Sequence, residues 1–198
     1  MNISAILGHP NKGSFNHAIA ETIVETLRNN GHWVNFHDLY EENFNPVVTS
    51  EELESSKSHD PLVETHCDEI KQAEGIVIVH PNWWGQPPAM LKGWIDRVIR
   101  PGVAYRFDEE DNGGGLPTGL LKARIGVVFN TSNTLAEREV SIFGDPLENI
   151  WKSCVFEFCG VNRFDRRMYR VIADSTPEER MGWLQDTKHL INKHFPKE

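Results

Sequence analysis

The chain has 198 residues, of which 39% are apolar and 25% charged, and we expect a single globular domain over residues 1–198. The net charge of −9 argues against nonspecific nucleic-acid binding, because few basic groups are left to neutralise phosphates. No run of about 18 apolar residues is present, so we expect no membrane span. The N-terminal MNISAILGHP lacks a basic stretch and predicts a first strand rather than a signal peptide.

In the first half of the chain, residues 3–7 form a short apolar run that ends at Gly8 and predicts a buried strand. Residues 16–30 carry apolar side chains four positions apart and predict an amphipathic helix that Gly31 closes. The elements predicted next are a strand at 33–37, polar helical stretches at 50–58 and 63–73, and an apolar strand at 75–79.

In the second half, residues 88–100 predict another amphipathic helix, and 108–119 form a polar, glycine-rich loop. Asp145 and Pro146 are a capping residue followed by proline, which predicts a helix from there to Gly160. The remaining predicted elements are a strand at 125–129, a polar edge strand at 164–172 and a last helix that opens at 176–179.

Strands that alternate with helices predict a doubly wound α/β fold with a parallel sheet and helices on both faces. Five strands over this length favour the flavodoxin-like order 2-1-3-4-5. In that order the chain reverses direction between strands 1 and 3, and ligands bind there over the carboxyl ends of the strands. We therefore expect the loops after strands 1, 3 and 4 to carry the chemistry.

The loop after the first strand leads directly into a helix. Its small and polar residues leave backbone N–H groups free beside the positive end of the helix dipole, so we expect an anion site with His9 and Lys12 as further donors. The lysine that a P-loop carries is missing after Gly13, and no GxGxxG motif is present, which argues against a nucleotide triphosphatase. A capped helix with a polar loop remains the alternative.

The loop after the third strand, HPNWWGQPP at 80–88, contains two adjacent tryptophans. Trp83 and Trp84 cannot both face one core, so at least one is expected to lie against a flat ligand or a partner subunit. Gly85 and the prolines stiffen the loop and let its backbone approach a planar ring. The alternatives are a loop folded onto the core and, for His80, an ordinary hydrogen-bonded histidine.

The loop after the fourth strand, 130–134, is a row of five small polar residues. Their amides and hydroxyls suit the polar edge of a heterocycle, although such residues are also ordinary turn formers. Because the topology brings all three loops to one rim, the phosphate site, the aromatic wall and the polar row together predict a bound flavin mononucleotide moiety.

Cysteine and histidine spacing argues against structural metal and disulfides. The three cysteines are odd in number and show no CxxC spacing, which favours a reducing, cytoplasmic setting. Cys154 and Cys159 fall in an apolar helical pattern and are expected in the core. The nine histidines show no HExxH or other ligand spacing, so we expect no metal site.

Several motifs occur in order over most of the chain. They are His9 with Ser14-Phe15-Asn16, Asp38-Leu39-Tyr40 with Asn43-Phe44-Asn45-Pro46, Pro81 and Trp84 with Pro88-Ala89-Met90-Leu91-Lys92-Gly93-Trp94, then Ala104-Tyr105, Gly144-Asp145 and Phe158-Cys159-Gly160. In these residues the chain resembles the NAD(P)H:quinone oxidoreductases, the DT-diaphorase-like branch of the flavodoxin superfamily.

The resemblance implies a flavin whose phosphate and ribityl end lies at the first loop, its ring against Pro81–Gly85 and its polar edge at Thr131–Asn133. It also implies ping-pong chemistry, in which NAD(P)H passes hydride to the flavin and a quinone-like acceptor then receives two electrons. The cofactor-binding residues predicted from the loops and the resemblance together are His9, Lys12, Ser14, Phe15, Asn16, Pro81, Asn82, Trp83, Trp84, Gly85, Thr131, Ser132 and Asn133.

The resemblance further implies a homodimer, because Tyr105 and Phe107 match aromatic positions that close the substrate pocket of the neighbouring subunit. The chain departs from the family at Glu137 and Phe143, where animal members carry a tyrosine and a histidine that assist charge transfer, and at 131–134, which replaces a glycine-rich loop. FAD is favoured over FMN, and the choice between NADH and NADPH stays open. Alternative functions are a flavoprotein regulatory subunit of a potassium efflux system and a flavodoxin-type electron carrier.

Overall fold

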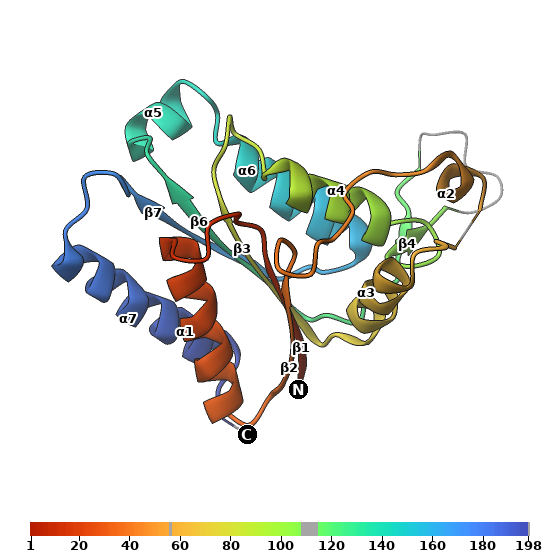
Figure 1. Ribbon diagram of the computed structural model, residues 1–198, viewed down its shortest axis with the longest axis horizontal. Helices are drawn as coiled ribbons and strands as arrows, with labels where there is room; N and C mark the ends of the chain where they lie inside the picture. Colours follow the sequence, from red (N-terminus) through yellow and green to blue (C-terminus); the bar gives the residue numbers. More distant parts are fainter. Residues whose placement is uncertain (56, 108–114, 198) are drawn as a thin grey trace.

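The computed structural model describes residues 1–55, 57–107 and 115–197, and its centre is a five-stranded parallel sheet (Figure 1). The strand order β2-β1-β3-β6-β7 is the predicted 2-1-3-4-5 order, so the flavodoxin-like fold is confirmed. The strands are β1 (Asn2–Leu7), β2 (Trp33–Asp38), β3 (Gly75–Pro81), β6 (Gly126–Ser132) and β7 (Phe164–Arg170).

Strand β3 shows why both faces of this sheet are covered. Ile76 and Ile78 point into one hydrophobic core, and Val77 and Val79 point into the other, as the alternation of a strand requires. A helical layer closes each core (Figure 1). One layer contains α1 (Phe15–Asn29) and α7 (Pro177–His194), and the other contains α3 (Pro61–Gln72), α4 (Ala89–Val98) and α6 (Pro146–Asn149).

The helix predicted from Asp145 to Gly160 is broken into three parts. After the four residues of α6 come the π-helical turn η1 (Ile150–Phe156) and the 3₁₀ turn η2 (Glu157–Cys159). On an α-helix Cys154 would share the buried face of Leu147, but the wider π turn shifts it to solvent. The prediction of core packing is therefore confirmed for Cys159 and wrong for Cys154.

Some elements differ from the prediction in extent. The glycine-rich loop predicted at 108–119 includes β5 (Thr118–Gly119), which pairs with β4 (Tyr105–Arg106), while 108–114 lie outside the described residues. The helix predicted at 50–58 is shorter, as α2 (Ser50–Glu54), and α5 (Ala136–Ser141) was not predicted. No helix in the described ranges is both long and apolar enough to cross a bilayer.

Strands β3 and β6 continue further than their apolar runs. The parallel ladder extends through His80 paired with Asn130 and Pro81 paired with Thr131. Because β6 runs through Ser132, most of the polar row predicted as a loop belongs to a strand. These strand residues are buried, since Asn130 is fully buried and Ser132 is only 5% exposed. The polar side chains are tolerated there because they hydrogen-bond within the fold or line a cavity.

Candidate functional site

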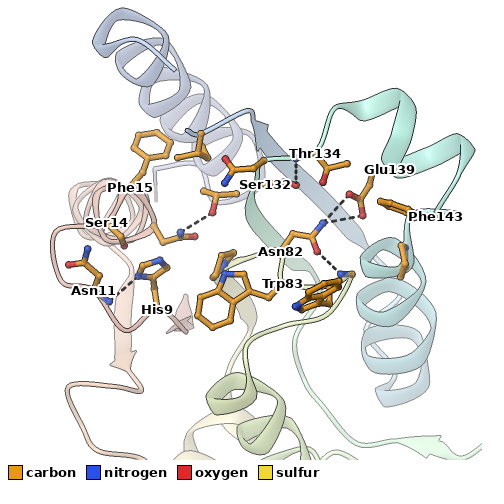
Figure 2. Close-up of a pocket in the computed structure, with 18 of the residues that line it drawn as sticks. His9, Asn11, Ser14, Phe15, Asn82, Trp83, Ser132, Thr134, Glu139 and Phe143 are labelled. Atoms are coloured by element: carbon orange, nitrogen blue, oxygen red, sulfur yellow. Dashed lines mark hydrogen bonds between the residues drawn. The ribbon is translucent and has the colours of Figure 1, made fainter. Parts of the chain in front are cut away.

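A cavity of about 970 Å³ lies where the carboxyl ends of β1, β3 and β6 meet (Figure 2). This is the position that the strand order predicts for a ligand, and the volume is of the size that cofactors occupy. Twelve of the thirteen predicted cofactor-binding residues line it, namely His9, Ser14, Phe15, Asn16, Pro81, Asn82, Trp83, Trp84, Gly85, Thr131, Ser132 and Asn133.

Three predicted site residues are placed elsewhere among the described residues. The Nζ of Lys12 lies 2.6 Å from the Oε1 of Glu41 in an exposed ion pair. The ring of Tyr105 packs edge-on against Phe158, with centroids 4.9 Å apart, and Phe107 joins this aromatic cluster. The binding role of Lys12 and the contribution of Tyr105 and Phe107 to a neighbouring subunit stay predictions.

The first wall of the cavity is the loop that leads into α1. Ser14 is the N-cap of this helix and accepts the N–H of His17, whereas no described residue accepts the N–H groups of Phe15 and Asn16, which suits these two to an anion. The Nδ1 of His9 accepts the N–H of Asn11 at 3.1 Å, so the ring proton of neutral His9 is on Nε2. Burial lowers the pKa of His9, which keeps this ring a neutral hydrogen-bond donor.

Asn16 joins the first loop to the strand end of β6. Its Nδ2 donates to the Oγ1 of Thr131 at 2.9 Å. Its Oδ1 is buried and accepts no hydrogen bond from any described residue, although the side chain lines the cavity. A buried acceptor without a donor is costly, so this oxygen is suited to accept a hydroxyl or N–H of a bound molecule.

The second wall is a tight hairpin turn after β3. Trp83 and Gln86 exchange two backbone hydrogen bonds of 3.1 and 3.0 Å, while Trp84 and Gly85 have φ values of 57° and 71°, as in a type I′ turn. A tryptophan is rarely found in this left-handed region. Trp84 is fully exposed and Trp83 is 43% exposed, which confirms that the two rings do not both face the core.

Asn82 fixes this turn to α5 (Figure 2). Its Oδ1 accepts the N–H of Gly85 at 2.9 Å, and its Nδ2 lies 3.1 Å from each carboxylate oxygen of Glu139. Glu139 is only 1% exposed and is the one buried residue of its helix. The turn after β3 and helix α5 are therefore held together by the side chain of Asn82.

Below the cavity, His80 supports the ends of β3 and β6. Its Nε2 accepts hydrogen bonds from the indole of Trp151 at 2.8 Å and from Asn130 at 2.9 Å, and its Nδ1–H donates to the carbonyl of Pro81. Burial lowers the pKa of His80 to about 4, so the ring is neutral. The ordinary hydrogen-bonded histidine is confirmed, and Asn130 bonds to His80 instead of lining the cavity.

Sequence reasoning missed part of the cavity wall. Ile172 and Arg180 follow β7, so the expectation that ligands bind at the carboxyl ends of the strands could have indicated them. Nothing in the sequence indicated Glu139. Phe143 lines the cavity, whereas Glu137 does not. The lining residues that were not predicted are Asn11, Gly13, Thr134, Arg138, Glu139, Phe143, Pro146, Ile172 and Arg180.

One group of described side chains, His37, Glu42 and His66, brings potential metal ligands within 4.8 Å of one another. The indole of Trp94 donates to the Nδ1 of His66 at 2.9 Å, so the neutral ring carries its proton on Nε2, 3.2 Å from Glu42. A metal-bound histidine donates its other ring N–H instead of accepting there. Glu42 is hydrogen-bonded to His37 and forms an ion-pair contact with His66, and the lack of a metal site stays a prediction.

Comparison with known proteins agrees with this architecture. A family model described as flavodoxin-like fold matches residues 1–187. An uncharacterised NAD(P)H oxidoreductase of Haemophilus influenzae is 35% identical over 85% of this chain and 83% of its own length. NAD(P)H dehydrogenase (quinone) 1 of Rattus norvegicus is 26% identical over 94% of this chain and 74% of its own.

A solved structure extends the comparison to the fold. The crystal structure of an FMN-dependent NADH-azoreductase from Bacillus anthracis, in complex with FMN, superposes with a TM-score of 0.77 at 16% identity. It covers 98% of this chain and 100% of its own. The chain therefore belongs to the flavodoxin-like fold family, as a relative of NAD(P)H oxidoreductases.

Proposed function

We propose that the protein is a flavin-dependent NAD(P)H oxidoreductase that reduces quinones or similar acceptors by two-electron hydride transfer. The observation that carries this proposal is the cavity itself, in which a helix N-terminus, an aromatic turn and a polar strand end converge over β1, β3 and β6. The names of the relatives from Haemophilus influenzae and Rattus norvegicus support the reaction class.

The lining residues fit a flavin. The α1 N-terminus with Ser14 and the Nε2–H of His9 would hold phosphate, and the unpartnered Oδ1 of Asn16 would accept a ribityl hydroxyl. The turn at Trp83–Gly85 would lie along the ring. The flavin, when bound, supplies the hydride-accepting chemistry, while the chain binds it, orients it and limits access of water.

The proposal also includes the identity of the flavin, the oligomeric state and the location. FAD remains the proposed cofactor through the resemblance, and FMN is the alternative, supported by the FMN-bound relative from Bacillus anthracis. A homodimer would explain why Trp84 is fully exposed and why Tyr105 and Phe107 lie outside the cavity of their own chain, and a cytoplasmic location is proposed from the cysteine pattern.

Purified protein tests the proposal directly. Heat release followed by mass spectrometry identifies the bound flavin, and steady-state oxidation of NADH and NADPH is then measured with and without a quinone. We expect one flavin per chain and acceptor-dependent turnover. Failure to bind any flavin after reconstitution with excess FAD and FMN would refute the proposal. Light scattering tests the dimer, and a monomer at micromolar concentration would remove the shared pocket.

A further inference from the structure

Three side chains form a hydrogen-bonded chain that leads from the cavity to the end of β2. The Oγ of Ser14 lies 2.9 Å from the Nδ1 of His17, and the Nε2 of His17 lies 3.0 Å from the Oδ2 of Asp38. Ser14 lines the cavity, whereas His17 and Asp38 are only 9% and 7% exposed. The cavity is thus connected to a buried histidine–carboxylate pair.

The hydrogen bonds determine where the protons are. Asp38 accepts the backbone N–H groups of Tyr40 and Glu41 through Oδ1, at 3.1 and 3.2 Å, so its Oδ2 is free to accept from His17. The proton of neutral His17 is therefore on Nε2, and Nδ1 accepts the hydroxyl proton of Ser14. When His17 carries a second proton, its Nδ1–H donates to the Ser14 oxygen instead.

These two states present different groups to the cavity. With neutral His17, the Ser14 hydroxyl proton points towards the ring and the Ser14 oxygen accepts the N–H of His17, so Ser14 has no hydrogen to donate into the cavity. With protonated His17, the Ser14 hydroxyl is free to donate into the cavity. A phosphate at a helix N-terminus binds through donors, so it favours the second state.

We propose that binding of the flavin's phosphate group at the α1 N-terminus is coupled to uptake of one proton from solvent by His17. The proton binds at Nδ1, Nδ1–H donates to Ser14, and the Ser14 hydroxyl turns to donate to a phosphate oxygen. Because such coupling is reciprocal, flavin affinity falls as the pH rises and His17 loses this proton. This inference rests on the proposed function, which places the flavin phosphate at α1.

The charged and titratable groups around His17 are Asp38, His9 and, nearer the surface, Lys12 and Glu41. The Oδ2 of Asp38 lies 3.0 Å from the Nε2 of His17, while Lys12 and Glu41 form an exposed ion pair with each other. His9 lies edge-on to His17, with ring centroids 6.0 Å apart, and burial lowers its pKa. His9 is therefore a neutral neighbour that adds no positive charge against protonated His17.

Isothermal titration calorimetry measures the proposed proton directly. The wild-type protein, stripped of its flavin, is titrated with FAD at pH 7 to 8.5 in buffers of different ionisation enthalpy. FAD is used because its pyrophosphate does not titrate in this range, whereas the monoester of FMN has a second pKa of about 6. If the chain binds only FMN, the proton count is corrected with a titration of free FMN.

We expect uptake that approaches one proton per FAD, a Kd that rises by up to about tenfold per pH unit, and no uptake with riboflavin, which lacks the phosphate. His17→Gln keeps a donor to Asp38 but cannot gain a proton, so uptake and pH dependence disappear. Ser14→Ala leaves His17 in place but removes the hydroxyl that connects it to the phosphate, so proton uptake and pH dependence disappear in this variant too. His189→Gln, at an exposed position of α7, is the matched control and behaves as wild type.

Several results overturn the proposal. FAD that binds without proton uptake contradicts it, as does uptake that persists in His17→Gln or is equal for riboflavin. Should His17→Gln fail to fold, Ser14→Ala decides by the same measurement. If flavin binds without proton uptake, the proposed function stands and only the role of His17 is refuted. If no flavin binds at any pH, both the proposed function and the role of His17 are refuted.

Discussion

Asn82 donates its side-chain amide to both carboxylate oxygens of Glu139, at 3.1 Å each, and so connects the turn after β3 to a helix fifty-seven positions further along the chain. Glu139 is buried, and hydrogen bonds to a charged group removed from water are stronger than those between neutral groups. The wall of the cavity therefore depends on a contact between the turn after β3 and helix α5, which are distant in the sequence.

Glu139→Ala is expected to weaken flavin binding about fivefold to tenfold, or about 1 to 1.4 kcal/mol, because Asn82 loses its acceptor and the turn at Gly85 is held less firmly. Titration of flavin fluorescence measures the change. Glu137→Ala is the matched control, since Glu137 is exposed on the same helix and does not line the cavity. Equal losses in both variants would show that α5 acts as a whole and not through Asn82.

Trp84 combines a left-handed backbone with full exposure, so its side chain is retained at a cost to stability. Trp84→Asn is expected to raise the free energy of unfolding by about 1 kcal/mol, because asparagine tolerates this region, and to lower kcat/KM for quinone reduction. Urea unfolding and steady-state kinetics measure the two effects. Trp33→Asn, at an exposed tryptophan of β2, should bring no such gain; a stabilised Trp33→Asn would argue that removing any exposed indole suffices.

Two glycines in helices are expected to respond in opposite directions to alanine. A Cβ at Gly93 in α4 would lie 2.2 Å from the backbone oxygen of Pro46, so Gly93→Ala should cost about 3 kcal/mol through overpacking. A Cβ at Gly182 in α7 would meet nothing within 4 Å, so Gly182→Ala should stabilise the fold by up to about 1 kcal/mol. Thermal unfolding of both variants checks the contrast, and a tolerated Gly93→Ala would mean that α4 and the segment at Pro46 move apart easily.

The His37–Glu42 pair should make stability depend on pH. Burial lowers the pKa of His37, but hydrogen bonds to Glu42 and Glu69 outweigh it, so the pKa is raised above 6.5. Burial raises the pKa of Glu42, yet hydrogen bonds from His37 and His66 bring it from 4.5 to about 2. The raised histidine pKa adds stability below pH 6.5 that is lost as pH rises through the folded-state value, and the lowered glutamate pKa adds stability above pH 4.5 that is lost towards pH 2.

The pair therefore contributes most between pH 4.5 and 6.5. His37→Gln should lower the free energy of unfolding more at pH 6 than at pH 9, measured by urea unfolding at both pH values. His189 is exposed, so His189→Gln should change the free energy of unfolding by the same small amount at both pH values. A loss for His37→Gln that does not depend on pH would mean that the ring contributes packing alone.

The order of the sheet was predictable because buried parallel strands are apolar throughout and alternate with amphipathic helices. The three loops of the site followed, since the carboxyl ends of parallel strands meet at one edge. The π-helical turn was not predictable, because the apolar spacing of Leu147, Trp151 and Val155 is also that of an α-helix. The extension of β6 was hidden for a different reason, because the Nδ2 of Asn130 hydrogen-bonds to His80 inside the core.

Helix α5, which forms part of the cavity wall, was not predicted because its sequence carries none of the usual helix signals. Leu135 takes the N-cap position without a side-chain hydrogen bond, and apolar residues such as Val140 and Ile142 are exposed on it. The burial of Glu139 depends on Asn82, which is distant in the sequence. Likewise, nothing in the spacing of Ser14, His17 and Asp38 indicated that they form one hydrogen-bonded chain.

The exposure of most of α5 makes this segment a natural place to redesign the enzyme. Glu139 is its one buried residue, while Arg138 and Phe143 face the cavity from the same stretch. A combinatorial library over 134–143 that retains Glu139 would change the part of the cavity wall formed by Thr134, Arg138 and Phe143 without entering either hydrophobic core. Variants selected from it would be catalysts for bulkier or more polar acceptors, built on an unchanged flavin-binding scaffold.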